Sequence, residues 1–495
     1  MRKRFEQQIP LGVISIPEVQ LPENSRDELP PVLKALQYVY TQPEINGSVF
    51  NLLENSVFSG NNHTGRPGMS LWEILVLGVV RLCLDIDYDR LHIMANYDKL
   101  VRSILGIENT FTEGKTYSLQ SLKDNIHKID DPTLEQINQI VCTAGFNLKK
   151  KDQENDLSLK IDTYALETNV HFPTDLNLLW DATRKCISIV DNLLDKYEFK
   201  GWRKIALWLR QVKNQFRDAS KKCFVNGYSD QAKKESVLNY INLASSVLKK
   251  VEQTLSDLSG RFAETSDMKG FAMLCELEYY KKYIIKQIDL IERRVINDEK
   301  IPSTEKVHSI FEPYTEWLKK GKAGNKVELG LKLLVATDQY NYIRHYEVVE
   351  KQVDSDLSIP VTETILRKYP QNPIGSLSFD KGFASKENKE IISLFVGKLI
   401  MPLKGKLSKV VKQEESSKEF KMLRNAHSAV EANINQLENN GLNRCPDKGI
   451  DGLKRYVGFG VLSYNLHHLG KDLIQKETDK KLKMAKKEKH QKLTA

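Results

Sequence analysis

The first 150 residues carry apolar positions at helical spacing, interrupted by turn-rich segments. The clearest helix start is Ser70, because Glu73 follows it at the spacing of a capping box. Another helix is expected over residues 89–105. Residues 149–156, KKKDQEND, contain no apolar side chain and indicate a boundary. We therefore expect an all-α region over residues 1–150.

The pattern changes to period two at residues 157–162, where apolar and polar residues alternate. This alternation predicts a half-buried strand that ends on Asp162. Residues 185–310 return to 3.6-residue periodicity with few helix breakers, so we expect a helical insertion there: a hairpin, a small bundle or an antiparallel coiled coil. Strand patterns at 327–337 and 343–349, separated by a polar turn, predict a β-hairpin.

The C-terminal part alternates strands and helices. Pro360 is expected to start a helix that ends at Lys368, a buried strand runs up to Asp380, and a long helix covers residues 418–438. Without the insertion, the order strand, two strands, helix, strand, helix, strand, helix matches an α/β ribonuclease-H-like fold. The expected parts are an all-α N-terminal region (1–150), the first part of the α/β domain (157–184), a helical insertion (185–310), the rest of the α/β domain (311–470) and a basic tail (471–495).

Composition adds a polyanionic partner to this picture. The chain of 495 residues is 40% hydrophobic and 28% charged, which fits packed cores rather than a disordered protein. Its 74 Lys and Arg against 65 Asp and Glu give a net charge of +9, and the tail beyond Gly470 is rich in lysine. Such a balance favours a polyanionic partner, although it does not define a fold.

The cysteines and the hydropathy pattern indicate the cellular compartment. The 6 cysteines are scattered without a CxxC pair, which argues for reduced thiols and against a disulfide framework or a zinc site. The longest apolar run, residues 71–84, is interrupted by Glu73 and Arg81 and is shorter than the roughly 20 residues of a membrane span. No apolar segment of the kind that a signal peptide needs follows the basic N-terminus. We therefore expect a cytoplasmic protein with no membrane partner.

Three acids occupy positions at which the expected sheet would gather them. Asp162 and Asp380 end strands, and Glu431 lies on the last long helix. Carboxylates on rigid elements are ligands that suit Mg²⁺, and two such ions can assist phosphoryl transfer. Spacing alone leaves other acids open, among them Glu438 on the same helical face as Glu431.

Three longer motifs contain these acids. Residues 162–175 read DTYALETNVHFPTD, residues 377–383 read LSFDKGF, and residues 427–445 read HSAVEANINQLENNGLNRC. Each resembles a segment of the DDE transposases of bacterial insertion sequences, in particular of the group often left unclassified (ISNCY). Matches at RFEQQ near the N-terminus, at the GRPG-led helix and at GFGVLSYNL extend the resemblance over nearly the whole chain. One departure is Tyr164-Ala165, where a small or β-branched pair such as Thr-Val is usual.

The resemblance implies an activity and a set of roles. It implies Mg²⁺-dependent cleavage at transposon ends and strand transfer into target DNA, with Asp162, Asp380 and Glu431 as catalytic residues and metal ligands and with Mn²⁺ able to substitute. The implied partner is double-stranded DNA, both the terminal inverted repeats and the target, and residues 1–150 would bind DNA and dimerise. Bringing two ends together favours a homodimer in the active complex. Such an enzyme would work in the bacterial cytoplasm, at the nucleoid when bound to DNA.

Other residues near these motifs have both functional and ordinary explanations. Glu167 could support the metal site or be a solvated strand residue, and His171 could contact phosphate or pack within a strand. Asp175 is expected to cap the helix that begins near Leu176. Candidates for contact with the DNA backbone share the helical face of Glu431 or follow the expected strands and loops: Arg424, His427, Lys404, Lys406 and Lys322.

Two rival interpretations stay open. The first is a metal-dependent DNA nuclease of the same fold that cleaves without strand transfer. The second is a non-catalytic DNA-binding protein derived from a transposase, in which the N-terminal helices and the basic tail bind DNA. The segment GKAGNK lacks the GxxxxGK(S/T) pattern, which argues against a nucleotide-binding loop.

Overall fold

The structure is a computed structural model. It describes residues 3–6, 13–22, 24–58, 68–108, 114–151, 154–263, 267–319, 327–403, 405 and 408–494. The chain divides into two compact units, one formed by Met1–Asn169 with Leu318–Ala495 and the other by Val170–Trp317. The second unit is therefore an insertion into the first, and together they make a mixed α/β protein that is mostly helical.

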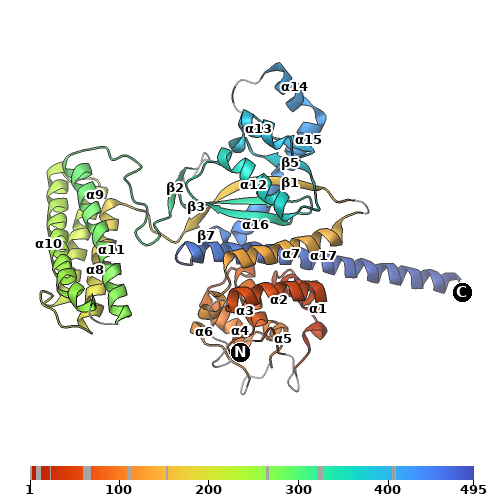
Figure 1. The fold of residues 1–495 in the computed structure, drawn as a ribbon, viewed down its shortest axis with the longest axis horizontal. Coiled ribbons are helices and arrows are strands. Elements are labelled where there is room, and N and C mark those ends of the chain that lie inside the picture. Colours follow the sequence, from red (N-terminus) through yellow and green to blue (C-terminus); the bar gives the residue numbers. More distant parts are fainter. Residues whose placement is uncertain are drawn as a thin grey trace. The chain divides into compact units, whose positions relative to one another are not determined.

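A sheet with parallel and antiparallel strands forms the core of the first unit (Figure 1). Its strands are β1 (Leu157–Thr168), β3 (Val327–Thr337), β4 (Ile343–Val349), β5 (Ile374–Phe379), β6 (Lys398–Ile400) and β7 (Arg444–Cys445), and β2 (Glu316–Lys319) lies at the boundary of the two units. The order β3-β1-β5-β6 is extended by β4 on β3 and by β7 on β1. β3 is antiparallel to β1 and to β4, whereas β5 is parallel to β1 and to β6.

One face of the sheet is apolar. Leu159 and Ile161 of β1 pack with Leu377 and Phe379 of β5 and with helix α12 (Asp354–Lys368). These residues alternate along their strands with polar ones, as the period of two predicts. Each such fully buried side chain stabilises the fold by roughly 1.5–3 kcal/mol. The alternation leaves the polar residues of both strands for the opposite face.

Helix α12 begins at Asp354, so the expected start at Pro360 was wrong. Pro360 lies inside the helix, where it removes one backbone hydrogen bond. Leu357, Val361 and Ile365 are buried at helical spacing and hold this helix on the sheet despite the missing bond.

The remaining helices of the first unit flank the sheet or precede it (Figure 1). They are α1 (Leu29–Thr41), α2 (Pro43–Phe58), α3 (Leu71–Cys83), α4 (Tyr88–Tyr97), α5 (Lys99–Leu105), α6 (Leu119–Ile126), α7 (Asp131–Lys149), α13 (Lys386–Ile392), α14 (Lys409–Ser416), α15 (Lys418–Ala426), α16 (Ser428–Leu437) and α17 (Ile450–Thr494). The capping box is confirmed, because Ser70 Oγ accepts from the Glu73 N–H and the Glu73 carboxylate accepts from the Ser70 N–H. The single helix expected over 89–105 is two, because Asp98 caps α5 through the Val101 N–H at 2.9 Å.

Helix α17 ties the N-terminal helices to the rest of the first unit. It packs against α1, α3 and α7. The approach to α1 is close, since a Cβ on Gly470 would lie 1.8 Å from the Pro31 carbonyl oxygen. Residues 1–150 therefore belong to the same compact unit as the sheet. The expected tail over 471–495 continues α17 as far as Thr494.

The second unit is a bundle of helices. They are α8 (Asp175–Leu194), α9 (Ile205–Phe224), α10 (Asp230–Ala263) and α11 (Met268–Ile291), followed by a π-helical turn (Glu292–Ile296). The periodic apolar positions of α10, among them Tyr240, Val247 and Val251, are buried in the core of this unit. The unit spans Val170–Trp317 and is thus wider than the expected 185–310.

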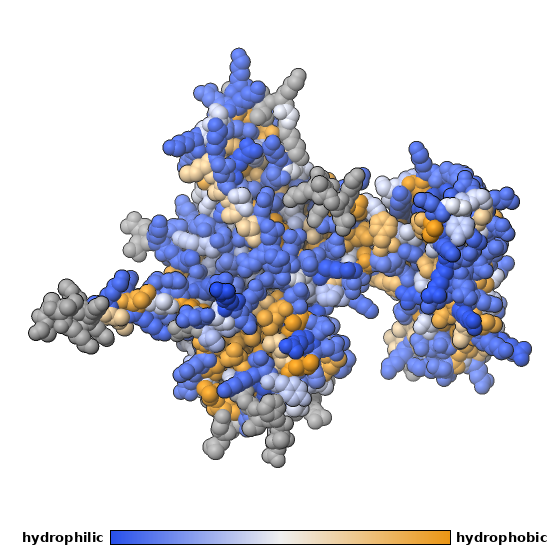
Figure 2. All heavy atoms as spheres, turned by 180° about the vertical axis from the view of Figure 1, so that it is seen from behind, coloured by the Kyte–Doolittle hydropathy of each residue, from blue (hydrophilic) through white to orange (hydrophobic). Residues whose placement is uncertain are grey.

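Surface hydropathy differs along the chain. Hydrophobic residues gather at the surface of the N-terminal helices, whereas the helical unit is predominantly hydrophilic in the same view (Figure 2). In the described parts of the chain, no helix combines the length and the apolar character that a membrane span requires.

Candidate active site

Asp162 and Asp380 are neighbours because of strand register. β1 and β5 run parallel, and Ile161 pairs with Phe379. The residue that follows on each strand is an aspartate. β5 ends at Phe379 as expected, so Asp380 stands at a strand end.

β1 does not end at Asp162, which corrects the sequence prediction. It continues to Thr168 because β3 supplies an antiparallel partner for every residue from Lys160 to Glu167. On the other edge of β1, the pairing with β5 stops at Ile161 and the pairing with β7 starts at Glu167. Asp162 therefore lies in mid-strand, at a stretch of this edge for which the described residues supply no strand partner.

Polar residues line the face of the sheet that carries Asp162. The hydroxyls of Ser158 and Ser376 are 2.6 Å apart, and the next pair along this face is Lys160 opposite Ser378. Lys160 is buried, which lowers its pKa, and its ammonium group donates to the Asp338 carbonyl at 3.3 Å. One buried cation thus stands directly before the two aspartates.

Glu431 reaches this face on α16, a helix that contacts β1 and β3. The single helix expected over 418–438 is interrupted at His427, which ends α15 and precedes α16. His427 Nδ1 lies 3.0 Å from Ser378 Oγ, so the junction of the two helices is held on β5. Burial lowers the pKa of His427, against the opposing effect of the Asp380 and Glu431 charges.

The acids influence one another electrostatically. Burial, with smaller contributions from the charges of Asp380, Asp354 and Glu431, raises the pKa of Asp162 to about 6, although the Thr163 N–H donates to its carboxylate at 2.7 Å. Asp380 and Glu431 are exposed, whereas Asp162 is half-buried.

The alternative acid, Glu438, begins the π-helical turn that follows α16 (Glu438–Leu442) and has a different neighbour. Its charge acts on Tyr164 and not on Asp162 among the effects that the structure describes. Glu431 is therefore the acid of α16 that is near Asp162.

Asp354 is an acid of this region that the sequence prediction missed. It accepts from Lys332 Nζ at 2.8 Å and from Thr163 Oγ1 at 3.3 Å. A Cβ on Gly382 would lie 3.0 Å from the Asp354 carboxylate, so the glycine of the DKGF segment permits a close approach of Asp354. The misplaced start of α12 hid Asp354, because it lies in the first turn of that helix.

Asp162, Asp380 and Glu431 offer carboxylate oxygens, which are the ligands that suit a hard divalent cation. The charges of Asp380 and Glu431 contribute to the raised pKa of Asp162. A cation held among them would relieve this repulsion. In the described residues, no three His, Cys, Asp or Glu side chains are arranged to hold a metal ion.

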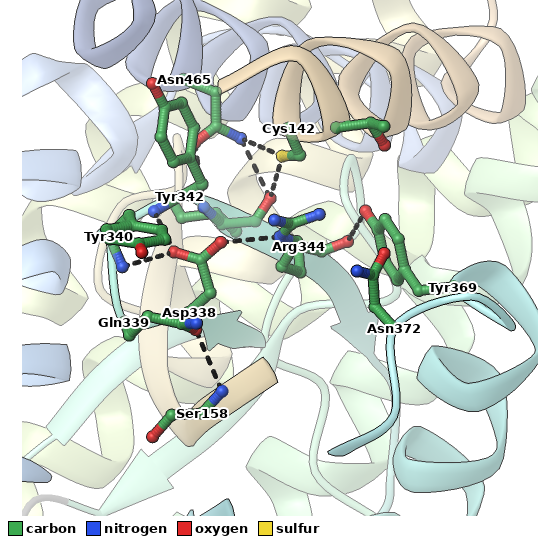
Figure 3. Close-up of polar contacts among 12 residues, drawn as sticks. Cys142, Ser158, Asp338, Gln339, Tyr340, Tyr342, Arg344, Tyr369, Asn372 and Asn465 are labelled. Atoms are coloured by element: carbon green, nitrogen blue, oxygen red, sulfur yellow. Dashed lines mark hydrogen bonds and ion pairs between the residues drawn. The ribbon is translucent and has the colours of Figure 1, made fainter. Parts of the chain in front are cut away.

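Asp338 and Arg344 form a buried ion pair (Figure 3). Arg344 Nε donates to Asp338 at 2.7 Å, and both side chains are 0% exposed. The Arg344 guanidinium also lies over the rings of Phe146 and Tyr369. Lys160 donates to the Asp338 carbonyl, so the ion pair of Asp338 with Arg344 also holds the acceptor of the Lys160 ammonium group in place.

The structure brings Glu167 to the end of β1, where its N–H donates to the Asn443 carbonyl at 3.0 Å beside β7. His171 and Asp175 belong to the helical unit. His171 follows β1 rather than packing within a strand, and its Nε2 lies 3.2 Å from Asp181.

The sequence prediction that Asp175 caps helix α8 was wrong. The cap is Thr174, which accepts from the Asn177 N–H at 3.1 Å. Asp175 is instead the first residue of the helix and pairs with Arg294 at 2.6 Å. Its carboxylate is favoured there by the positive end of the helix dipole.

The candidate DNA contacts are only partly described. Arg424 is exposed on α15, and His427 is bonded to Ser378 as given above. Lys322, Lys404 and Lys406 lie outside the described residues. No protein-family model, curated protein or solved structure matches this chain.

Proposed function

We propose that this chain is a DDE transposase, with Asp162, Asp380 and Glu431 as its catalytic acids. The observation that carries the proposal is the parallel pairing of Ile161 with Phe379, which makes the two aspartates neighbours while the charge of Glu431 acts on Asp162. The mixed sheet, in which β3 and β5 flank β1 and β4 pairs with β3, is compatible with a ribonuclease-H-like domain and so supports the same proposal.

The three acids would hold two Mg²⁺ or Mn²⁺ ions, which when bound activate the attacking oxygen and stabilise the leaving one. The chain itself orients these acids. The Thr163 N–H fixes the Asp162 carboxylate, and the contact of His427 with Ser378 holds the start of α16 on β5. Because Asp380 and Glu431 are exposed, a DNA backbone can reach them from solvent.

The proposed reaction has two stages. Water attacks the phosphodiester at a transposon end, which frees a 3′ hydroxyl on the transposon and leaves a 5′ phosphate on the flanking DNA. The 3′ hydroxyl then attacks a phosphodiester of the target DNA, joins its 5′ side and releases a 3′ hydroxyl of the target strand. Neither stage needs a covalent enzyme intermediate. The partner is double-stranded DNA, consistent with the net charge of +9, and two ends held together favour a homodimer in the active complex.

A strand-transfer assay tests this function. Duplexes that end in the DNA flanking this coding sequence are incubated with the protein, a supercoiled plasmid and Mg²⁺ or Mn²⁺. We expect donor ends joined to the plasmid. Cut ends that are never joined would instead identify a nuclease, and binding without cutting would identify a non-catalytic DNA-binding protein.

A further inference from the structure

Helix α9 of the helical unit carries a row of cations on one face. The side chains of Arg210, Lys213, Arg217 and Lys221 are all exposed. Spacings of three or four residues return to the same side of an α-helix, so the four form a single row about 16 Å long. We call these four residues the α9 stripe.

The cations of the α9 stripe have no acidic partner among the ion pairs of the described residues. The one acid of α9, Asp218, is bound by Lys222 at 2.8 Å. Other cations of this unit do have acidic partners: Lys185 pairs with Glu276, Lys234 with Asp298, and Arg293 with Asp289, Glu299 and Glu305.

Repulsion along the stripe disfavours the helix. Lys213 and Arg217, and likewise Arg217 and Lys221, are like charges four residues apart. The buried side of α9, which includes Val212 and Ala219, holds the helix in the bundle instead. The stripe is thus a set of exposed, mutually repelling cations on a rigid support.

We propose that the α9 stripe binds the phosphate backbone of double-stranded DNA, an inference that rests on the proposed function and assigns a DNA contact to the helical unit. A duplex carries one negative charge per roughly 1.7 Å of its axis, so a stripe of this length faces several phosphates at once. Asn214, which is exposed on the same face, adds a donor suited to a phosphate oxygen.

A lipid surface fits α9 less well. A helix that lies on a membrane needs an apolar face free to enter the lipid. Val212 and Ala219 of α9 are instead buried in the core of the helical unit. The exposed apolar side chains of α9, Leu207, Leu209 and Phe224, lie near the two ends of the helix and form no continuous apolar face. Phosphates of a duplex need only the basic face.

The test measures how DNA binding depends on salt. A labelled duplex of arbitrary sequence is titrated with the full chain in EDTA at several NaCl concentrations, so that cleavage is not needed. The stripe variant replaces each member by glutamine: Arg210→Gln, Lys213→Gln, Arg217→Gln and Lys221→Gln. The matched control makes the same charge change at exposed lysines of α10 and α11: Lys249→Gln, Lys269→Gln, Lys282→Gln and Lys286→Gln.

We expect the slope of log affinity against log salt to become shallower by roughly 3 to 4 in the stripe variant, and by less than about 1 in the control. Arg217→Gln alone should reduce the slope by about 1 and serves if the fourfold variant fails to fold. Equal slopes in wild type and stripe variant, or an equal change in the control, would overturn the proposal. A stripe variant that no longer binds phosphatidylserine vesicles but binds DNA as the wild type does would also overturn the proposal.

The salt-slope test of the stripe and the strand-transfer assay of the proposed function can fail independently of each other. A salt slope that depends on the stripe, in a protein that never cuts DNA, leaves the stripe standing and removes the transposase. Conversely, joined products from the stripe variant with an unchanged salt slope would retain the transposase and remove the stripe.

Discussion

His427 Nδ1 lies 3.0 Å from Ser378 Oγ, and this contact joins the junction of α15 and α16 to the strand that ends before Asp380. Glu431 is in the first turn of α16. The position of Glu431 relative to Asp380 therefore depends on a hydrogen bond between two residues that need not touch a metal ion.

Replacement of that hydroxyl tests the dependence. Ser378→Ala should weaken Mn²⁺ binding and metal-dependent cleavage by roughly 10- to 100-fold, as is typical when a residue that orients metal ligands is lost. Isothermal titration with Mn²⁺ and cleavage rates measure both. The control is Ser376→Ala on the same face of β5, whose hydroxyl contacts Ser158. An equal loss in the control would contradict a specific role for Ser378.

The raised pKa of Asp162 makes stability depend on pH. Because its folded pKa is about 6, against 3.8 for an ordinary aspartate, the stability that Asp162 contributes is fully present below about pH 4 and is lost as the pH rises through about 6. Asp162→Asn should therefore stabilise the protein at pH 7.5, by about 1–3 kcal/mol. Urea unfolding at several pH values measures this, and a gain that persists undiminished at pH 4 would contradict it.

Metal affinity should follow the same titration. A protonated Asp162 cannot ligate a cation, so apparent Mn²⁺ affinity should fall as the pH drops through about 6. Asp354→Asn removes one of the charges that raise the pKa of Asp162, so the midpoint should move to lower pH. Titrations with Mn²⁺ at a series of pH values locate the midpoint. A shift to higher pH in Asp354→Asn would refute the assigned neighbourhood.

The ion pair of Asp338 and Arg344 should be a stability element of the fold. Both side chains are 0% exposed, so Asp338→Asn leaves a buried guanidinium without its partner, which should destabilise the fold by about 3–5 kcal/mol. Removing both charges, in Asp338→Asn with Arg344→Met, should be less damaging than the single change. Urea unfolding compares the two, and a single variant as stable as wild type would contradict the role.

The sequence predicts those parts of the site that depend on local pattern. An apolar strand before Asp380 and the capping box at Ser70 both follow from residues close in the chain. The length of β1 could not be predicted this way, because its partner β3 begins only after the helical unit, at Val327.

Two further features depended on contacts that sequence spacing does not reveal. The break at His427 accompanies its bond to Ser378, which a helical pattern across residues 418–438 does not show. Asp354 was missed because proline usually marks the first turn of a helix, whereas Pro360 is tolerated within α12, whose buried face packs on the sheet.

The most direct test of the central claim compares metal-dependent cleavage by four variants on a duplex that ends in the flanking DNA. The variants are Asp162→Asn, Asp380→Asn, Glu431→Gln and, as the matched control on the same helical segment, Glu438→Gln. We expect the first three to lose cleavage by about a hundredfold or more while still binding the duplex, and Glu438→Gln to keep it. Undiminished cleavage by Asp380→Asn, or an equal loss in Glu438→Gln, would contradict the assignment of Asp162, Asp380 and Glu431.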